Sequence, residues 1–217
     1  MIKNFSKILL KAYNQFLLPL GGKKVSIPYR INIPPIEHPA RQGKSAPGVI
    51  LKQLYEDAKE QNFDLKKAST EEIREFMKKN NLGLDCSGFV YRMLDFLVQE
   101  VKGKSLTEAG FEHVGLTNVA ILTDNIHSAK IGLKDIKPGD MIKTNSTGDI
   151  DHLLIVIDRK KNQLTYAHSS RETTPSGVHL SGAKLVHSPD GIIFEEDLGN
   201  IAYNINAGDG PRRLKAL

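Results

Sequence analysis

The amino-acid sequence of 217 residues predicts an α+β fold in which helices are followed by an antiparallel sheet. In the first half of the chain, apolar residues recur at helical spacing, most clearly in the run that follows Cys86. After residue 140 the pattern changes to short apolar runs, 151–158 and 163–168, separated by polar turns, which is typical of strands. Cys86, the chain's single cysteine, stands where one of the helices should begin.

The composition is that of an ordinary globular protein, with 40% hydrophobic and 25% charged residues. One cysteine allows no disulfide within the chain, so the redox compartment is left open. The net charge of +5 favours polyanions, which include nucleic acid, anionic lipid and an acidic cell wall. Because zinc-finger spacings, RNA-binding aromatic signatures and dense basic blocks are missing from the sequence, we expect no nucleic-acid partner.

The N-terminal segment predicts an amphipathic helix, with Ile2, Phe5, Leu9, Ala12 and Phe16 on one face. Lys11, Asn14 and Gln15 interrupt the apolar run that a secretory signal would need, so no signal peptide is expected. The sequence also predicts no integral membrane segment. A helix docked on the domain is favoured over an interfacial membrane anchor. The expected location is the cytoplasm, or outside it after release by a non-standard route.

An extended, proline-rich arm should follow this helix. Gly21-Gly22-Lys23-Lys24 is predicted to end the helix and to introduce the arm. Half of the ten prolines then lie close together and bias the backbone toward extended conformations; they are Pro28, Pro34, Pro35, Pro39 and Pro47. Residues 1–46 are therefore interpreted as a helix with a wrapping strap or linker, and residues 47–217 as the main domain.

Two helices should lead to the cysteine. The first begins at Pro47 and carries Ile50, Leu51 and Leu54 on one face. The second should begin at a capping box formed by Ser69 and Glu72. Beyond the cysteine helix, the pattern up to the turn Lys137-Pro138-Gly139-Asp140 does not choose between helix and strand, and His113 and His127 are interpreted as surface or packing residues.

Cys86 should lie in the first turn of a buried helix. There, unpaired backbone N–H groups and the positive end of the helix dipole would favour the thiolate and lower the thiol pKa, as a nucleophile requires. The flanking Asp85 and Ser87, with Gly88 after them, suit an open pocket better than a core. The alternative is an inert packing residue, since most free cysteines are buried and unreactive.

Two histidines should supply a base for the thiol. If the strands that contain His152 and His168 are joined by a three-residue loop, these residues are directly opposite and share one face of the sheet. Their imidazoles would be close enough to hydrogen-bond, with His152 as the base and His168 fixing its tautomer. A zinc site made from Cys86 and both histidines is the alternative, but the spacings that favour metal are absent.

Five short motifs together carry a resemblance to a known family. They are Asp85-Cys86-Ser87-Gly88-Phe89, Lys137-Pro138-Gly139-Asp140, His152 at the start of an apolar strand, Ala167-His168-Ser169-Ser170 and Ser176-Gly177-Val178. In order and spacing, over roughly residues 70–185, the chain resembles the NlpC-type cysteine peptidases of the papain-like superfamily. The resemblance implies a papain-like fold for residues 47–217, with the catalytic cysteine at a helix N-terminus.

The resemblance also implies an activity. That family hydrolyses peptide bonds in the stem peptides of bacterial peptidoglycan, typically between γ-D-glutamate and a diamino acid, so the expected partner is peptidoglycan or a muropeptide. Cys86, His152 and His168 take the catalytic positions, Asp85 and Ser87 match positions that shape the substrate pocket, and neither cofactor nor metal is implied. A papain-like acyltransferase and a catalytically inactive wall-binding module remain alternatives, and the oligomeric state is left open.

Overall fold

The computed structural model describes residues 4–31, 39–145, 151–174, 176–186, 191–195 and 203–217. Its helices are α1 Phe5–Asn14, α2 Pro47–Glu60, α3 Thr70–Lys79, α4 Cys86–Lys102 and α5 Val119–Leu122. Its strands are β1 Leu17–Leu20, β2 Lys23–Ser26, β3 Ser128–Lys130, β4 Met141–Thr144, β5 His152–Lys160, β6 Gln163–Ser170, β7 Gly177–Leu185, β8 Ile192–Phe194 and β9 Gly210–Leu214.

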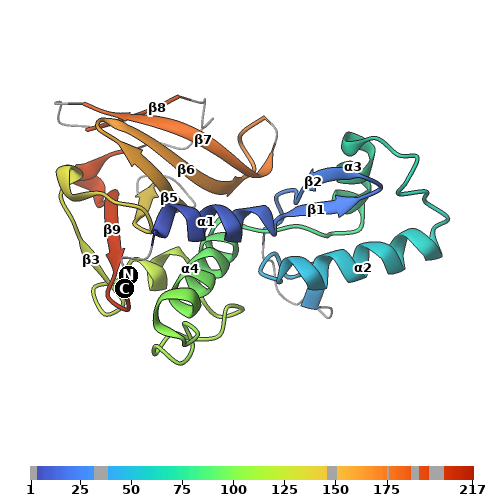
Figure 1. The fold of residues 1–217 in the computed structure, drawn as a ribbon, viewed down its shortest axis with the longest axis horizontal. Coiled ribbons are helices and arrows are strands. Elements are labelled where there is room, and N and C mark those ends of the chain that lie inside the picture. Colours follow the sequence, from blue (N-terminus) through green and yellow to red (C-terminus); the bar gives the residue numbers. More distant parts are fainter. Residues whose placement is uncertain (1–3, 32–38, 146–150, 175, 187–190, 196–202) are drawn as a thin grey trace.

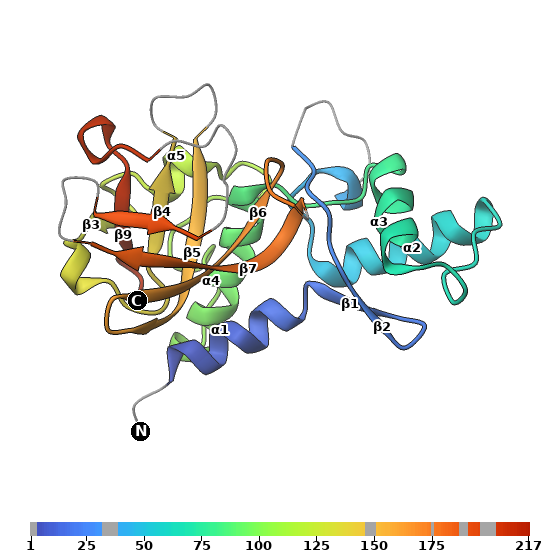
Figure 2. The same ribbon diagram turned by 90° about the horizontal axis from the view of Figure 1, so that it is seen from above.

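The strands after α4 form one antiparallel sheet, which confirms the predicted α+β class. Within the described residues its order is β3-β9-β4-β5-β6-β7-β8, and every strand pair in it is antiparallel. The sheet lies at one end of the molecule, with α4 packed against it, and α2, α3 and the β1–β2 hairpin lie at the other end (Figures 1 and 2). The backbone amide of Asp85 donates to the carbonyl of Gly43, in the segment that leads into α2, so the first turn of α4 lies where the two ends meet.

The apolar side chains of β5 divide between two cores. Leu153 and Ile155 belong to the larger cluster, which includes α1, α4 and the β1–β2 hairpin. Leu154 and Val156, pointing the other way, belong to a second cluster on the opposite face of the sheet, with Tyr166. A strand buried on both faces reads as a continuous apolar run, which is how 153–157 appears in the sequence.

The N-terminal helix packs on the domain, as the favoured interpretation predicts. α1 buries Leu9, Ala12 and Tyr13 and contacts α4 and β5. It is shorter than the predicted amphipathic stretch: Phe16 lies beyond its end and meets the ring of Phe89 edge-on at 4.9 Å between centroids. Ile2 lies outside the described residues. None of the described helices combines the length and the hydropathy that a membrane crossing requires.

The prediction that Gly21-Gly22 ends the first helix is wrong. Gly21 and Gly22 are instead the two-residue turn of the β1–β2 hairpin, in which Leu20 pairs with Lys23. Both glycines have positive φ, at +55° and +78°, which two-residue hairpin turns of this kind require and which other residues adopt at a cost. A Gly-Gly pair between two short segments is therefore a signal of a hairpin.

After the hairpin, residues 27–31 form a strap that wraps over the domain. The carbonyl of Ile27 accepts from the amide of Val178, and the carbonyl of Pro28 accepts from the amide of Leu84, two residues before the cysteine. The amide of Arg30 returns a bond to Leu84. The strap therefore joins the start of β7 to the approach to α4. Pro34 and Pro35 of the predicted arm lie outside the described residues.

The local signals between residues 47 and 140 are confirmed. α2 begins at Pro47, and the Ser69–Glu72 capping box is formed in both directions, with bonds of 2.7 and 3.2 Å. The region between α4 and the turn at 137–140, for which the sequence does not choose between helix and strand, contains the short α5 and β3. His127 makes local contacts there, with its ring bonded to Asp124 at 2.9 Å.

Candidate active site

Cys86 is the first residue of α4, and Asp85 caps the helix. One carboxylate oxygen of Asp85 accepts from the backbone amide of Gly88 at 2.5 Å, which satisfies one of the donors that a helix start leaves unpaired. Gly88 is needed because a Cβ there would lie 2.7 Å from the carbonyl oxygen of Gly43. The backbone at Gly43 can therefore pack directly against the turn that presents the sulfur.

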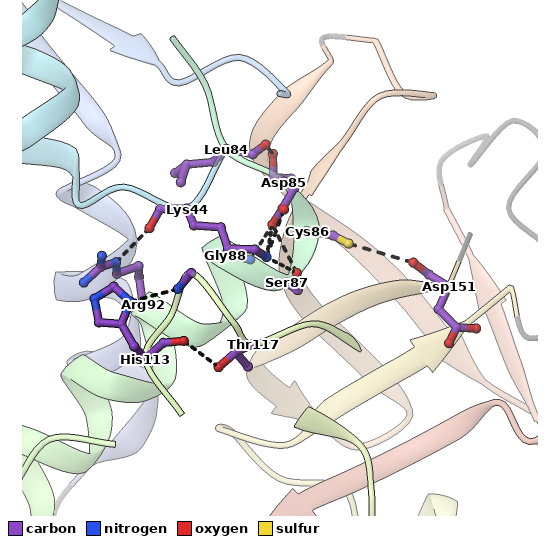
Figure 3. Close-up of polar contacts among 12 residues, drawn as sticks. Lys44, Leu84, Asp85, Cys86, Ser87, Gly88, Arg92, His113, Thr117 and Asp151 are labelled. Carbon is purple, nitrogen blue, oxygen red and sulfur yellow. Dashed lines mark hydrogen bonds and ion pairs between the residues drawn. The ribbon is translucent and has the colours of Figure 1, made fainter. Parts of the chain in front are cut away.

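A buried lysine neutralises this cap. The ammonium of Lys44 lies 3.0 Å from one carboxylate oxygen of Asp85 and 3.2 Å from the other, and it donates to the hydroxyl of Ser87 at 2.7 Å (Figure 3). All three side chains are buried. Asp85 and Ser87, predicted to shape a substrate pocket, are thus bound to Lys44, and a substrate amine would have to compete with that ammonium for the carboxylate.

The sulfur of Cys86 points away from this ion pair and toward the start of β5 (Figure 3). It lies 4.0 Å from the carbonyl oxygen of Asp151, and the backbone amide of Leu153 also bonds to it. The neighbours on both sides of His152 therefore contact the thiol. The carboxylate of Asp151 is itself paired with Lys143 of β4 at 3.0 Å, which ties this segment to the sheet.

The expectation of a lowered thiol pKa is wrong for this structure. Burial, together with the nearby Asp85 carboxylate, raises the pKa of Cys86 to about 12, although the Leu153 amide and Lys44 act in the opposite direction. Only 6% of the residue is exposed. The resting group is a thiol at neutral pH, so nucleophilic attack requires a base that removes its proton.

The strand pairing differs from the predicted hairpin in two ways. The turn contains two residues, since Lys160 pairs with Gln163, so the three-residue loop on which the direct opposition of the histidines depended is not formed. An even loop alone would put His152 and His168 on opposite faces. A bulge between Val156 and Asp158 adds one residue to β5 and reverses that alternation.

The bulge therefore brings the two histidines onto one face, but diagonally rather than directly opposite. Ile155 pairs with Ala167, so continuing this register places His168 across from Leu154. The two rings still meet: Nε2 of His152 and Nδ1 of His168 are 2.9 Å apart, with the rings edge-on to each other. Both residues are buried, at 6% and 0% exposed. The Cys86 sulfur thus contacts the backbone on both sides of His152, and the ring of His152 contacts that of His168.

A third histidine extends this pair. His179 lies directly opposite His168 on β7, and their Nε2 atoms are 2.9 Å apart. The other ring nitrogen of His179, Nδ1, is 3.0 Å from the carbonyl oxygen of Gly177. Sequence reasoning missed His179. The signal was available, because it is two residues from the Gly177 of a quoted motif and alternates with it on the strand.

A cavity of about 310 Å³ opens beside the sulfur, which is within the size range of ligand pockets. The strap, the first turn of α4 and the start of α5 contribute most of its lining, which consists of Tyr29, Ile31, Asp85, Cys86, Ser87, Asn118, Val119, Ala120 and Asp151. Tyr29 and Asn118 were also missed, because they come from segments whose distance from the cysteine the sequence does not reveal. Burial and the nearby Cys86 and Asp85 raise the pKa of Tyr29, so its hydroxyl stays protonated and can donate.

Among the described residues, His, Cys, Asp and Glu side chains form no group of three or more that could hold a metal ion. The ring nitrogens that join His152, His168 and His179 face one another, which leaves them engaged in hydrogen bonds.

Neither a scan of the sequence against protein-family models nor a search of curated proteins gives a match.

Proposed function

We propose that this chain is a papain-like cysteine peptidase that hydrolyses stem peptides of bacterial peptidoglycan, at γ-D-glutamyl-diamino acid bonds. The observation that carries the proposal is the meeting of a helix-start thiol with the first residues of β5, where His152 is hydrogen-bonded to His168 at 2.9 Å. A thiol, a base and a group that orients the base form the arrangement used for nucleophilic acyl transfer. The basic net charge of +5 suits an acidic cell wall.

The first half of the reaction forms a thioester. His152 takes the proton of the Cys86 thiol as the sulfur attacks the amide carbonyl carbon, so that a carbon–sulfur bond forms. The oxyanion is held by the backbone N–H of Cys86, at the positive end of α4. The carbon–nitrogen bond then breaks, and the proton held by His152 passes to the departing amine.

The second half consumes water. His152 removes a proton from water as its oxygen attacks the thioester carbon, and the proton returns to the sulfur as the thiol leaves. The products are a carboxylate and the regenerated thiol. Because burial keeps the pKa of Cys86 raised to about 12, the thiolate exists only while the base holds its proton, which gives His152 a role in both halves.

Incubation with defined muropeptides that carry either diaminopimelate or lysine tests the proposal. The wild-type chain should release the diamino-acid fragment, identified by mass spectrometry, and Cys86→Ala should release none while keeping the wild-type circular dichroism spectrum. The lysine peptide shows whether the second carboxylate of diaminopimelate is needed. Turnover by a folded Cys86→Ala protein at the wild-type rate would refute the assignment.

One observation favours a second candidate, a wall-binding module without catalysis. The sulfur is only 6% exposed and its pKa is raised, as in an inert buried cysteine. Alkylation by iodoacetamide separates the two: labelling of Cys86 that depends on His152 supports the peptidase, and a thiol that stays unlabelled in the folded chain supports the module.

A further inference from the structure

Three imidazole rings form a continuous hydrogen-bonded chain that ends on a backbone carbonyl. His152 Nε2 meets His168 Nδ1 at 2.9 Å, His168 Nε2 meets His179 Nε2 at 2.9 Å, and His179 Nδ1 meets the carbonyl oxygen of Gly177 at 3.0 Å. Each contact uses a different ring nitrogen or the carbonyl, so each needs one proton. His152 and His168, at one end of this hydrogen-bonded chain, belong to the proposed active site, and His179, toward the other end, does not.

The carbonyl at the end of the chain sets the direction of every bond. A carbonyl oxygen only accepts, so Nδ1 of His179 must carry its proton, and in a neutral ring Nε2 of His179 then accepts. His168 must therefore donate from Nε2 and accept at Nδ1. His152 must in turn donate from Nε2, which leaves its Nδ1 as the nitrogen with the lone pair.

The anchoring carbonyl is held from two sides. Gly177 has φ +108°, and a Cβ there would lie 2.5 Å from the carbonyl oxygen of Ile27, so the strap closes directly on this residue. The amide of Val178 donates to that same oxygen at 2.9 Å. The guanidinium of Arg74 on α3 donates to the carbonyl of Ser176. The end of the chain is therefore fixed by elements distant from the sulfur.

We infer that His179 is a positioning residue which, through His168, fixes His152 in the tautomer that carries its proton on Nε2. The inference rests on the proposed function, in which His152 takes the thiol proton, since a ring protonated on Nε2 can accept that proton only at Nδ1. A bare pair of histidines could donate in either direction, whereas the anchored chain permits only one. His179 thereby selects which nitrogen of the base carries the proton.

Nuclear magnetic resonance of the full chain, with ¹⁵N-labelled histidine, reads the tautomers directly. We expect the Nδ1–H form at His179 and the Nε2–H form at His168 and His152. In His179→Leu, the donor of His168 loses its acceptor, and His152 should become a mixture of both tautomers. In His179→Gln, the side-chain oxygen can accept in place of Nε2, so the Nε2–H form of His152 should return.

His127→Asn is the matched control, because that ring is bonded to Asp124 and packs on Phe111. It should leave the His152 signals unchanged. A wild-type His152 protonated on Nδ1, or an unaltered His152 tautomer in His179→Leu, would overturn the inference. If His179→Leu fails to fold, the wild-type spectrum and His179→Gln still decide it. The spectra need no substrate, so a failure to cleave muropeptides counts against the proposed function alone.

Discussion

The sulfur side and the imidazole side of the candidate site are held together by different kinds of interaction. On the sulfur side, Lys44, Asp85 and Ser87 form a buried charged cluster around the first turn of α4. On the imidazole side, His152, His168 and His179 form a chain of ring-to-ring hydrogen bonds that ends on the backbone. A charged pair resists the removal of either partner, while a hydrogen-bonded chain controls where protons reside. Substitutions on the two sides should therefore be detected by different measurements.

Removing the base should produce the largest effect, and on activity rather than on stability. His152→Ala should lower hydrolysis of the susceptible muropeptide by about 10²–10⁴-fold, the usual contribution of a positioned general base. His168→Ala should lower it less, because the proposed role of that ring is to orient His152 and not to take the thiol proton. The measurement is kcat/KM, with circular dichroism to verify folding.

His113→Ala provides the control for the histidine substitutions, since that ring accepts only a local amide bond from Gly115 among its described contacts. It should retain wild-type kcat/KM. If His152→Ala retains it too, His152 is not the base.

Breaking the ion pair should mainly affect stability. Lys44→Met leaves the carboxylate of Asp85 buried without its cation, and loss of one partner of a buried pair costs about 3–5 kcal/mol. Urea denaturation gives the free energy of unfolding. In the double variant Lys44→Met/Asp85→Asn, the charge left unpaired is also removed, so part of the loss should be recovered. Equal stability of wild type and Lys44→Met would mean that the charged cluster does not hold the turn.

The same comparison explains which parts of the site could be predicted. The sulfur side depends on short-range rules: Asp85 followed by an apolar helical run is sufficient to place Cys86 at a helix start. The thiol pKa was still mispredicted, because the helix position was recognised but the depth of burial was not. Burial depends on the strap and on Lys44, both more than forty residues away in the chain.

The imidazole side depends on strand register, which local patterns define poorly. The apolar runs 151–158 and 163–168 predicted both strands, but the two-residue turn and the bulge at Ile157 are invisible in that pattern. The two-residue turn alone would place His152 and His168 on opposite faces of the sheet, and the bulge returns them to one face. The histidines therefore meet for a reason other than the predicted one. The motif that contains Gly177 marks the neighbourhood of His179, but its role also requires β7 to pair with β6, and sequence motifs do not give strand order.

Alkaline pH should weaken the fold through the thiol. The pKa of Cys86 is raised from 9.0 to about 12 on folding, so the unfolded chain loses its proton first. The associated stability is intact below pH 9.0 and is lost as the pH rises toward about 12. Cys86→Ala lacks this group, so its free energy of unfolding, measured by urea denaturation across the same interval, should fall less than that of wild type. Parallel decreases would show that the thiol is not held in its neutral form.

The smallest effect is expected far from both sides. Ser69→Ala removes the hydroxyl that accepts from the amide of Glu72 in the capping box of α3 and should cost about 1 kcal/mol. Among the described residues, Arg74 links α3 to the anchor of the imidazole chain, because it bonds to Ser26 and Ser176 from the middle of the helix. The histidine tautomers and kcat/KM should therefore stay at wild-type values while the urea midpoint falls. A shift in the His152 tautomer in Ser69→Ala would mean that the helix start, and not Arg74 alone, supports the anchor of the imidazole chain.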